Sequence, residues 1–241
     1  MKFAFWLMAE SQVACEIAAH AGYDIVLIDL EHGAFDVKDL DRLAPFCKGL
    51  GLTVYARVSA AERVPIQRAL DFGADGVILP QIQNAAHARE ATAYAKYPPL
   101  GTRGMGYSRI QDYGGVGDEF AAAENGRTLC LPMIETPTAL AEVEAIVALD
   151  TVDGLFVGPS DLALTSGRGQ NQWRDSDFAD IRTAAKAAKR ADKWYATTGG
   201  ENPAARAVGE EVGADFLSAG DDLTALVLGF EAMMNMARGK A

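Results

Sequence analysis

The chain of 241 residues lacks any apolar run close to the roughly 20 residues that a membrane-spanning helix requires. Its first residues, MKFAFWLMAESQ, turn polar too soon for a secretory signal peptide. Basic residues are scarce, with 22 Lys and Arg against 33 Asp and Glu, so the formal charge is -11 and the surface repels a phosphate backbone. The sequence therefore predicts a cytoplasmic protein that has neither a membrane nor a nucleic acid as partner.

Cysteine and histidine are also rare, with three residues of each. Cys15, Cys47 and Cys130 are too few and too scattered for a disulfide framework or a zinc knuckle, and we expect them to be buried thiols. His32 has no second His or Cys at a spacing suited to zinc. The other two, His20 and His87, lie in segments of helical pattern and are expected at the surface.

No Ser-rich or Pro-rich linker divides the chain, and no Gly-x-Gly-x-x-Gly follows the first apolar run. Instead, short apolar runs alternate with Ala-rich segments of helical period. Eight such units favour an α/β fold, a (β/α)₈ TIM barrel formed by a single domain over residues 1–241. The predicted strands are 3–8, 24–30, 52–57, 76–80, 128–134, 153–157, 194–198 and 215–219.

A weak internal repeat supports this alternation. AGYDIVLID (21–29), FGADGVILP (72–80) and VGADFLSAG (212–220) share one plan, in which a Gly ends a helix, an Asp occupies the turn and an apolar strand follows. We expect helices over 62–72, 84–95 and 137–148 and a long Gly-rich loop over 97–117. The segment 222–237 is apolar beyond one face, which fits either a subunit contact or a helix covered by its own barrel.

The stretch DIVLIDLEHGAFD (24–36) ends a buried strand in three ionisable side chains. In a (β/α)₈ barrel the active site lies at the C-terminal ends of the strands. Any one polar residue there is ordinarily a loop residue facing water, but four strands that deliver polar groups to the same rim predict a reaction centre. The residues at these four strand ends are Asp29, Glu31, His32, Arg57, Glu135, Ser160 and Asp161.

Glu135 and Asp161 follow neighbouring strands with no basic residue beside them. Two converging carboxylates repel each other unless a cation lies between them. Oxygen ligands suit Mg²⁺ or Mn²⁺, and two protein ligands leave coordination positions open for Lewis-acid catalysis. An ordinary salt-bridged pair is the structural alternative.

The turn in FVGPSD presents backbone N–H groups after the sixth predicted strand, which makes a cradle for a carboxylate or phosphate. Arg57 adds a positive fork beside it. No lysine falls at the C-terminal end of a predicted strand, which argues against a Schiff-base mechanism. The lysines are Lys2, Lys38, Lys48, Lys96, Lys186, Lys189, Lys193 and Lys240.

Six motifs, in order over nearly the whole chain, resemble the HpcH/HpaI family of metal-dependent class II pyruvate aldolases. They are IDLEHG (28–33), ARV (56–58), GADGVILPQIQNAAHA (73–88), YPPLGTRGMG (97–106), MIET (133–136) and VGPSDLA (157–163). The resemblance implies a barrel assembled as a homohexamer, with the C-terminal helix exchanged between subunits. It also implies reversible cleavage of 4-hydroxy-2-oxo acids, sugar-acid derivatives among them, to pyruvate and an aldehyde through a metal-stabilised enolate.

The same resemblance implies roles for individual residues. Glu135 and Asp161 would bind a divalent metal, Mg²⁺ or Mn²⁺, with Co²⁺ as a further candidate. Arg57 would stabilise the enolate oxygen, and His32 would be the base that acts on the C4 hydroxyl. Asp71 resembles the aspartate that pairs with the histidine of a neighbouring subunit. The residues implied to bind substrate are Arg57, Met133, Gly158, Pro159, Ser160 and Asp161.

Two departures from the family pattern bear on substrate choice. Met133 stands where many members have a Gln that contacts the keto acid, and Gly199 with Gly200 predicts a roomier aldehyde pocket. Two alternatives are a lyase of malyl or citramalyl thioesters, disfavoured by the acidic surface, and a non-catalytic barrel that binds a keto acid. The presence of His32 and Arg57 argues against the latter.

Overall fold

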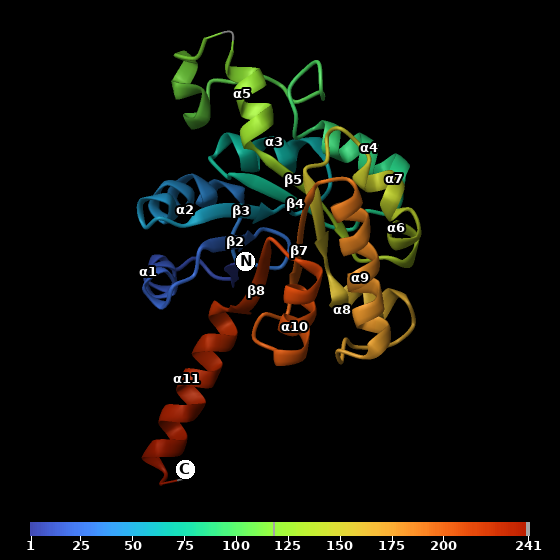
Figure 1. Ribbon diagram of the computed structural model, residues 1–241. Coiled ribbons are helices and arrows are strands. Elements are labelled where there is room, and N and C mark those ends of the chain that lie inside the picture. Colours follow the sequence, from blue (N-terminus) through green and yellow to red (C-terminus); the bar gives the residue numbers. More distant parts are fainter. Residues whose placement is uncertain (118, 240–241) are drawn as a thin grey trace.

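A computed structural model describes residues 1–117 and 119–239 of the chain. Eight parallel strands form a closed barrel in which each strand pairs with the next and β8 pairs with β1. Figure 1 shows the strands at the centre of the molecule, with helices around them. The (β/α)₈ fold is confirmed, and every strand lies within two residues of its predicted place. The strands are β1 (Lys2–Leu7), β2 (Ile25–Asp29), β3 (Thr53–Arg57), β4 (Gly76–Leu79), β5 (Leu129–Ile134), β6 (Gly154–Val157), β7 (Trp194–Thr198) and β8 (Phe216–Asp221).

Helices surround the barrel, and none of those in the described part of the chain is long and apolar enough to cross a membrane. They are α1 (Gln12–Ala21), α2 (Val37–Gly49), α3 (Arg63–Asp71), α4 (Ala85–Ala93), the 3₁₀ helix η1 (Arg109–Gly114), α5 (Phe120–Arg127), α6 (Pro137–Ala141), α7 (Val143–Val147), α8 (Pro159–Thr165), α9 (Asp175–Arg190), α10 (Pro203–Val212) and α11 (Asp222–Ala237).

Two segments differ from their predicted form. The segment 137–148 forms two short helices instead of one, because the backbone at Glu142 leaves the helical region with φ -103° and ψ 15°. The Glu142 side chain there accepts the backbone N–H of Ala85 at the start of α4 (2.8 Å). The loop 97–117 contains η1, which a Gly-rich composition does not predict.

The Gly-Asp repeat ties strands together at the N-terminal end of the barrel. Its glycines take the left-handed conformation that glycine adopts without a Cβ clash, as at Gly22 (φ 95°) and Gly213 (φ 70°). Each aspartate then accepts a backbone N–H from the strand beside its own. The bonds are Asp24 to Phe3 (2.9 Å), Asp75 to Val54 (3.0 Å) and Asp215 to Tyr195 (2.8 Å). Asp153, outside the repeat, does the same for Cys130 (2.7 Å), so alternate strand pairs are joined.

Two apolar layers hold the barrel. An inner cluster fills its interior with side chains such as Leu27, Ile78 and Phe156, and a larger outer cluster lies between the strands and the helices. Each such large side chain contributes about 1.5–3 kcal/mol when removed from water. All three cysteines are buried, as expected. With its interior filled, the barrel leaves the rims as the place for chemistry.

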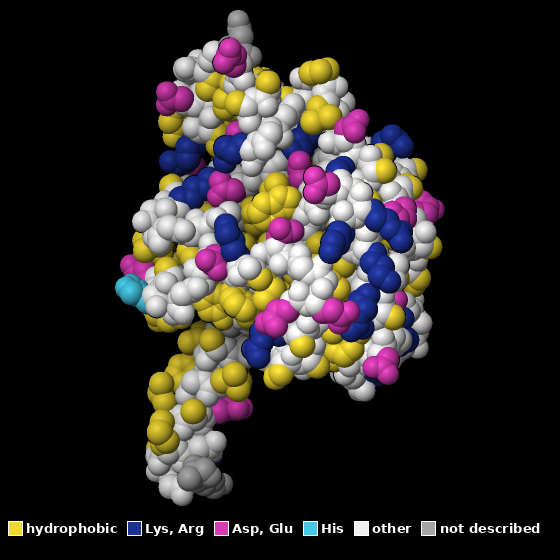
Figure 2. Space-filling view, viewed as in Figure 1, with side chains coloured by type: hydrophobic (Ala, Val, Ile, Leu, Met, Phe, Trp, Pro, Cys, Tyr) yellow, Lys and Arg dark blue, Asp and Glu magenta, His cyan; other side chains and the backbone are white. Residues whose placement is uncertain are grey.

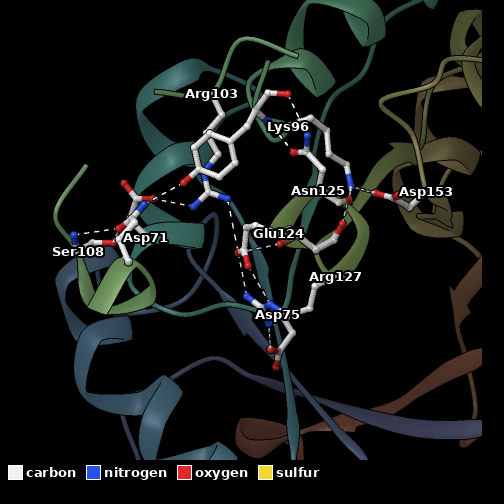
Figure 3. Close-up of polar contacts among 12 residues, drawn as sticks. Asp71, Asp75, Lys96, Arg103, Ser108, Glu124, Asn125, Arg127 and Asp153 are labelled. Atoms are coloured by element: carbon white, nitrogen blue, oxygen red, sulfur yellow. Dashed lines mark hydrogen bonds and ion pairs between the residues drawn. The ribbon is translucent and has the colours of Figure 1, made fainter. Parts of the chain in front are cut away.

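Lys96 is part of a polar cluster, shown in Figure 3, at the N-terminal side of β5 and β6. Its fully buried ammonium donates to the backbone oxygens of Thr128 (2.6 Å) and Asn125 (2.8 Å) and pairs with Asp153 (2.7 Å). A buried charge is tolerated only when it is paired and hydrogen-bonded in this way. The cluster therefore fixes the chain where it enters the loop 97–117.

The C-terminal helix α11 projects away from the barrel, as Figure 1 shows. Its apolar side chains stay in water, with Phe230 66% and Met236 71% exposed. Figure 2 shows hydrophobic side chains along the surface of this helix. A groove of about 670 Å³ lies between α1 and α11, lined by residues such as Ile17 and Leu226. Of the two alternatives for this segment, the helix covered by its own barrel is therefore wrong for the single chain, because one chain does not bury it.

Candidate active site

A cavity of about 410 Å³ opens among the C-terminal ends of the strands. Seven of the nine predicted site residues line it, and the other two, His32 and Asp71, do not. The seven are Arg57, Met133, Glu135, Gly158, Pro159, Ser160 and Asp161. The structure thus brings together groups from β3, β5 and the β6–α8 turn, as the parallel barrel requires.

Asp29 and Arg57 form the most extensive polar contact in the cavity wall. They are register partners at the last positions of β2 and β3, so their side chains emerge at the same rim. The Arg57 guanidinium donates from Nε to Asp29 Oδ1 (2.9 Å) and from Nη2 to Oδ2. Asp29 is fully buried and also accepts the backbone N–H groups of Glu31 (3.0 Å) and His32 (3.2 Å). One carboxylate therefore fixes both the guanidinium and the loop after β2.

The guanidinium is also held from its other sides. Its carbon lies 4.8 Å from the ring centroid of Trp6, and its Nε lies 3.3 Å from Glu31. The indole N–H of Trp6 in turn donates to Ser218 on β8 (3.0 Å). Burial opposes the charged form of Arg57, but the hydrogen bonds and charges of Asp29 and Glu31 outweigh it and raise the pKa of the guanidinium. The cavity therefore contains a fixed cation at any accessible pH.

Glu135 is buried at the end of β5, with its two oxygens in different surroundings. Oε1 accepts the backbone N–H of Gln81, whose φ of 54° turns that N–H after β4. Oε2 faces Gly158, where an added Cβ would lie 2.9 Å from it. Because Gly158 has no side chain, this carboxylate oxygen has space to lie beside it.

Burial raises the pKa of the Glu135 carboxyl to about 7. That value includes the negative charges of Asp161 and Glu31, which also raise the pKa, and the Gln81 N–H and Arg57, which lower it. A buried carboxylate beside other carboxylates is costly unless a cation neutralises it. The electrostatics of this wall therefore suit a bound cation.

Asp161 stands in the first turn of α8, which begins at Pro159 directly after Gly158. No side chain caps that turn, so its backbone N–H groups remain available to a ligand. Met133, buried on β5, lies beside Gly158 and has no strong donor or acceptor. The wall between β5 and β6 thus offers oxygen ligands and backbone donors but lacks an amide side chain.

The donor set fits a divalent cation with two protein ligands. Glu135 Oε2 and Asp161 supply the hard oxygens that Mg²⁺ or Mn²⁺ prefers. Among residues 1–117 and 119–239, no three His, Cys, Asp or Glu side chains lie close enough together to form a complete metal cage. A two-ligand site leaves positions for substrate and water, which is the open arrangement of a catalytic metal.

His32 and Asp71 lie apart from the cavity wall. The His32 side chain is 61% exposed, and its Nε2 is 3.8 Å from Glu31. Asp71 ends α3 and pairs with the buried Arg103 (2.7 Å), as Figure 3 shows. In the described part of the chain no contact joins His32 to Asp71, so any pairing between them requires a second subunit.

The two glycines after β7 do not open the cavity. An added Cβ at Gly199 would lie 2.4 Å from the indole of Trp173, which packs against this backbone and stacks on Phe178. The φ of 98° at Gly199 also favours glycine. The expectation of a roomier aldehyde pocket at these positions is therefore wrong, because Trp173 fills the space. Thr198 is the β7 residue in the wall.

The described lysines lie away from the cavity at the C-terminal ends of the strands. None of the seven described lysines lines the cavity, and the buried Lys96 is on the opposite side of the barrel. Lys240 lies outside the described residues.

Several wall residues have no counterpart in the sequence prediction. Trp6 and Met8 come from the end of β1, and Asp221 comes from the end of β8. Asp29 was recognised as a strand-end charge but not as the partner of Arg57. Its register position opposite Arg57 is the signal that would have identified it.

Comparisons with known proteins identify the family to which the chain is similar. The model of the HpcH/HpaI aldolase/citrate lyase family matches residues 2–211. The 2-dehydro-3,6-dideoxy-6-sulfogluconate aldolase of Pseudomonas putida is 38% identical over 67% of this chain and 64% of its own length. The 4-hydroxy-2-oxo-heptane-1,7-dioate aldolase of Salmonella paratyphi C is 32% identical over 95% of this chain and 87% of its own length.

A solved structure agrees with these matches. The HpcH/HpaI aldolase of Desulfitobacterium hafniense superposes with a TM-score of 0.89 at 27% identity, covering 98% of this chain and 92% of that one. The family model, the relatives and the fold coincide over nearly the whole barrel. The chain belongs to the HpcH/HpaI aldolase/citrate lyase family.

Proposed function

We propose that the protein is a divalent-metal-dependent aldolase that reversibly cleaves 4-hydroxy-2-oxo acids to pyruvate and an aldehyde. The relatives named above are aldolases, which are carbon–carbon lyases, and the family is the one to which this chain belongs. The observation that carries the proposal is the cavity shared by Glu135, Asp161 and Arg57. A cytoplasmic location remains a prediction from the sequence.

Cleavage breaks the bond between C3 and C4 of the substrate. A base removes the proton of the C4 hydroxyl, the aldehyde departs, and the electron pair stays with C3 as the enolate of pyruvate. A proton then returns to C3. The reaction therefore needs a base at one end of the cavity and stabilisation of negative charge at the other.

Arg57 is placed to supply that stabilisation. Its guanidinium is in the cavity wall and is oriented by Asp29 before any substrate arrives, so no reorganisation is needed when charge develops on the enolate oxygen. The uncapped turn at Ser160 and Asp161 would receive the pyruvate carboxylate. Met133 forms an apolar wall beside it.

Glu135 and Asp161 would hold the metal. A divalent cation there would supply Lewis acidity, drawing electron density from the 2-oxo group of the substrate. The carboxyl of Glu135 would be held in its ionised form by the same cation, against the rise in pKa that burial causes. Mg²⁺ and Mn²⁺ suit these oxygen ligands, with Co²⁺ as a third candidate.

His32 is the proposed base, and Asp71 of a neighbouring subunit is its proposed partner. Two observations support this role: the backbone N–H of His32 is bound by Asp29 of the cavity wall, and the His32 side chain is exposed and so accessible to a neighbouring subunit. The exposed apolar face of α11 and the groove beside α1 support assembly into a homo-oligomer, a hexamer in this proposal, in which α11 is exchanged between subunits.

Exchange of the methyl protons of pyruvate in deuterated water, followed by NMR, tests the proposal. An aldolase of this type exchanges them only when Mg²⁺ or Mn²⁺ is present and stops when a chelator is added. A protein that merely binds keto acids would leave the methyl signal intact, and a thioester lyase would need an acyl thioester. Either of those results would refute the proposed activity.

A further inference from the structure

The cavity has a second end, which meets the proposed pyruvate site where the Trp6 ring lies 4.8 Å from the guanidinium carbon of Arg57. Arg57 ends β3, Glu135 follows β5 and Asp161 lies in the turn after β6. Apart from Asp29 on β2, the rest of the wall comes from the ends of β1, β7 and β8 and from the start of α11. Trp6, Thr198 and Asp221 are the side chains that these strands contribute. If pyruvate binds at the first end, the aldehyde must occupy the second.

The charge at this second end is negative. Asp221 is its one carboxylate among the described residues, while Asp29, Glu135 and Asp161 and the one cation of the wall, Arg57, lie at the pyruvate end. That cation is bound to Asp29, lies close to Glu31 and serves the enolate oxygen in the proposed function, so it is not free for an anion on the aldehyde. A divalent ion and the pyruvate carboxylate would leave the aldehyde end facing Asp221 without a compensating charge.

The backbone donors that could receive an anion at this end are also occupied. Asp221 accepts both the backbone N–H and the hydroxyl of Thr224 at the start of α11 (2.7 Å each). The buried Asp222 accepts the N–H groups of Met8 (2.8 Å) and Ala9 (3.2 Å). The N-terminus of α11 is therefore neutralised by the chain's own carboxylates, and an incoming carboxylate or sulfonate finds no positive end of a helix.

The same groups suit a neutral, hydroxylated ligand. Each oxygen of Asp221 uses one acceptor position for Thr224 and keeps another for a donor from the cavity. Thr198 adds a hydroxyl from β7, and the Trp6 ring adds an apolar face. We propose that the acceptor subsite formed by Trp6, Thr198 and Asp221 takes an uncharged hydroxyaldehyde and rejects aldehydes that carry an anionic group.

This inference rests on the proposed aldolase function and narrows its substrate class. It would separate this chain from relatives such as the 4-hydroxy-2-oxo-heptane-1,7-dioate aldolase, whose substrate is named as a dioate. Pyruvate proton exchange needs no aldehyde, so its failure counts against the aldolase function alone. Discrimination between aldehydes in a protein that performs the exchange tests the subsite alone.

Glycolaldehyde and glyoxylate are a matched pair of two-carbon aldehydes, one with a hydroxymethyl group and one with a carboxylate. Their kcat/KM values for addition to pyruvate are compared with Mn²⁺ present. The ratio of glyoxylate to glycolaldehyde should rise with ionic strength up to about 0.5 M, because salt screens the repulsion. A ratio that falls with salt, as a cationic subsite would give, overturns the inference.

Asp221→Asn removes the charge and keeps a residue that caps α11 equally well. The glyoxylate to glycolaldehyde ratio should rise by about tenfold in this variant, since one unscreened neighbouring charge is removed. Glu210→Gln, an exposed residue of α10 outside the cavity wall, makes the same charge change and should leave the ratio unaltered. An unchanged ratio in Asp221→Asn would also overturn the inference.

Discussion

Gly158 and Glu135 are packed so closely that a side-chain carbon at position 158 would lie 2.9 Å from Glu135 Oε2 and 3.2 Å from its Cβ. Gly158 itself has a φ of -98°, which any residue adopts, so the contact with Glu135 accounts for the glycine here and backbone strain does not. The absence of a side chain directly after β6 therefore leaves the space in which the Glu135 carboxylate lies.

Gly158→Ala should displace the Glu135 carboxylate and weaken divalent metal binding by about tenfold or more, because displaced ligands lose that much affinity. Titration of Mn²⁺ followed by electron paramagnetic resonance measures the affinity for the metal. The activity at saturating metal measures how much catalysis the variant retains once the metal is bound. Gly126→Ala in α5, where an added Cβ meets nothing within 4 Å, is the matched control and should bind metal normally. Unchanged affinity in Gly158→Ala would mean that Glu135 is not a ligand.

Asp29→Asn should destabilise the fold by about 3 kcal/mol, because it leaves the largely buried Arg57 guanidinium without its main partner. The backbone bonds to Glu31 and His32 survive, since an amide oxygen accepts as well. Urea titration measures the free energy of unfolding of each variant. Glu144→Gln breaks the exposed pair with Arg190 (2.6 Å) and should cost less than about 1 kcal/mol. Equal losses of unfolding free energy in the two variants would contradict the claim that the buried Asp29–Arg57 pair contributes more than an exposed pair.

The pKa of Glu135 predicts how stability depends on pH in the metal-free protein. Because the folded-state value of about 7 exceeds the unfolded value of 4.5, the stabilising contribution is complete below pH 4.5 and disappears as the pH rises through 7. The loss amounts to about 3 kcal/mol. Chelated protein should therefore lose stability over this range by denaturant titration, and Glu135→Gln should lose less. Parallel curves for the two proteins would show that Glu135 titrates normally.

His32→Ala and Asp71→Asn should each lose activity by about a hundredfold or more, the usual contribution of a positioned base. If the pair forms between subunits, co-expression of the two inactive variants should restore roughly a quarter of the wild-type activity, since mixed oligomers contain some intact sites. Separately purified variants that cannot exchange subunits serve as the control. No recovery in mixed oligomers would show that this pairing between subunits does not form.

The apolar stripe of α11 predicts assembly. Phe230→Glu should shift the protein to smaller species in light scattering, because Phe230 is 66% exposed in a single chain and a charge there opposes burial. Asn235→Glu adds the same charge to the same helix at a polar position and should leave the mass unchanged. A monomeric wild-type protein would remove the basis for exchange of α11.

The strands, their order and most of the cavity wall could be predicted because each depends on local pattern. Apolar runs mark strands, and a barrel brings their ends together whatever the loops do. What failed depends on distant contacts: nothing near Gly199 indicates that Trp173 occupies its side-chain space, and nothing in the loop 97–117 indicates that Arg103 binds Asp71. His32 was predicted from a motif, and the single chain leaves it exposed because its proposed partner belongs to another subunit.

Trp6 lies beneath the Arg57 guanidinium in the cavity wall, whereas Trp173 stacks on Phe178 and Trp194 starts β7 at the far end of the barrel. Of the three tryptophans, Trp6 is therefore the one whose surroundings change when a ligand enters the cavity. The ultraviolet emission of Trp6 should therefore follow occupancy of the cavity without any attached dye.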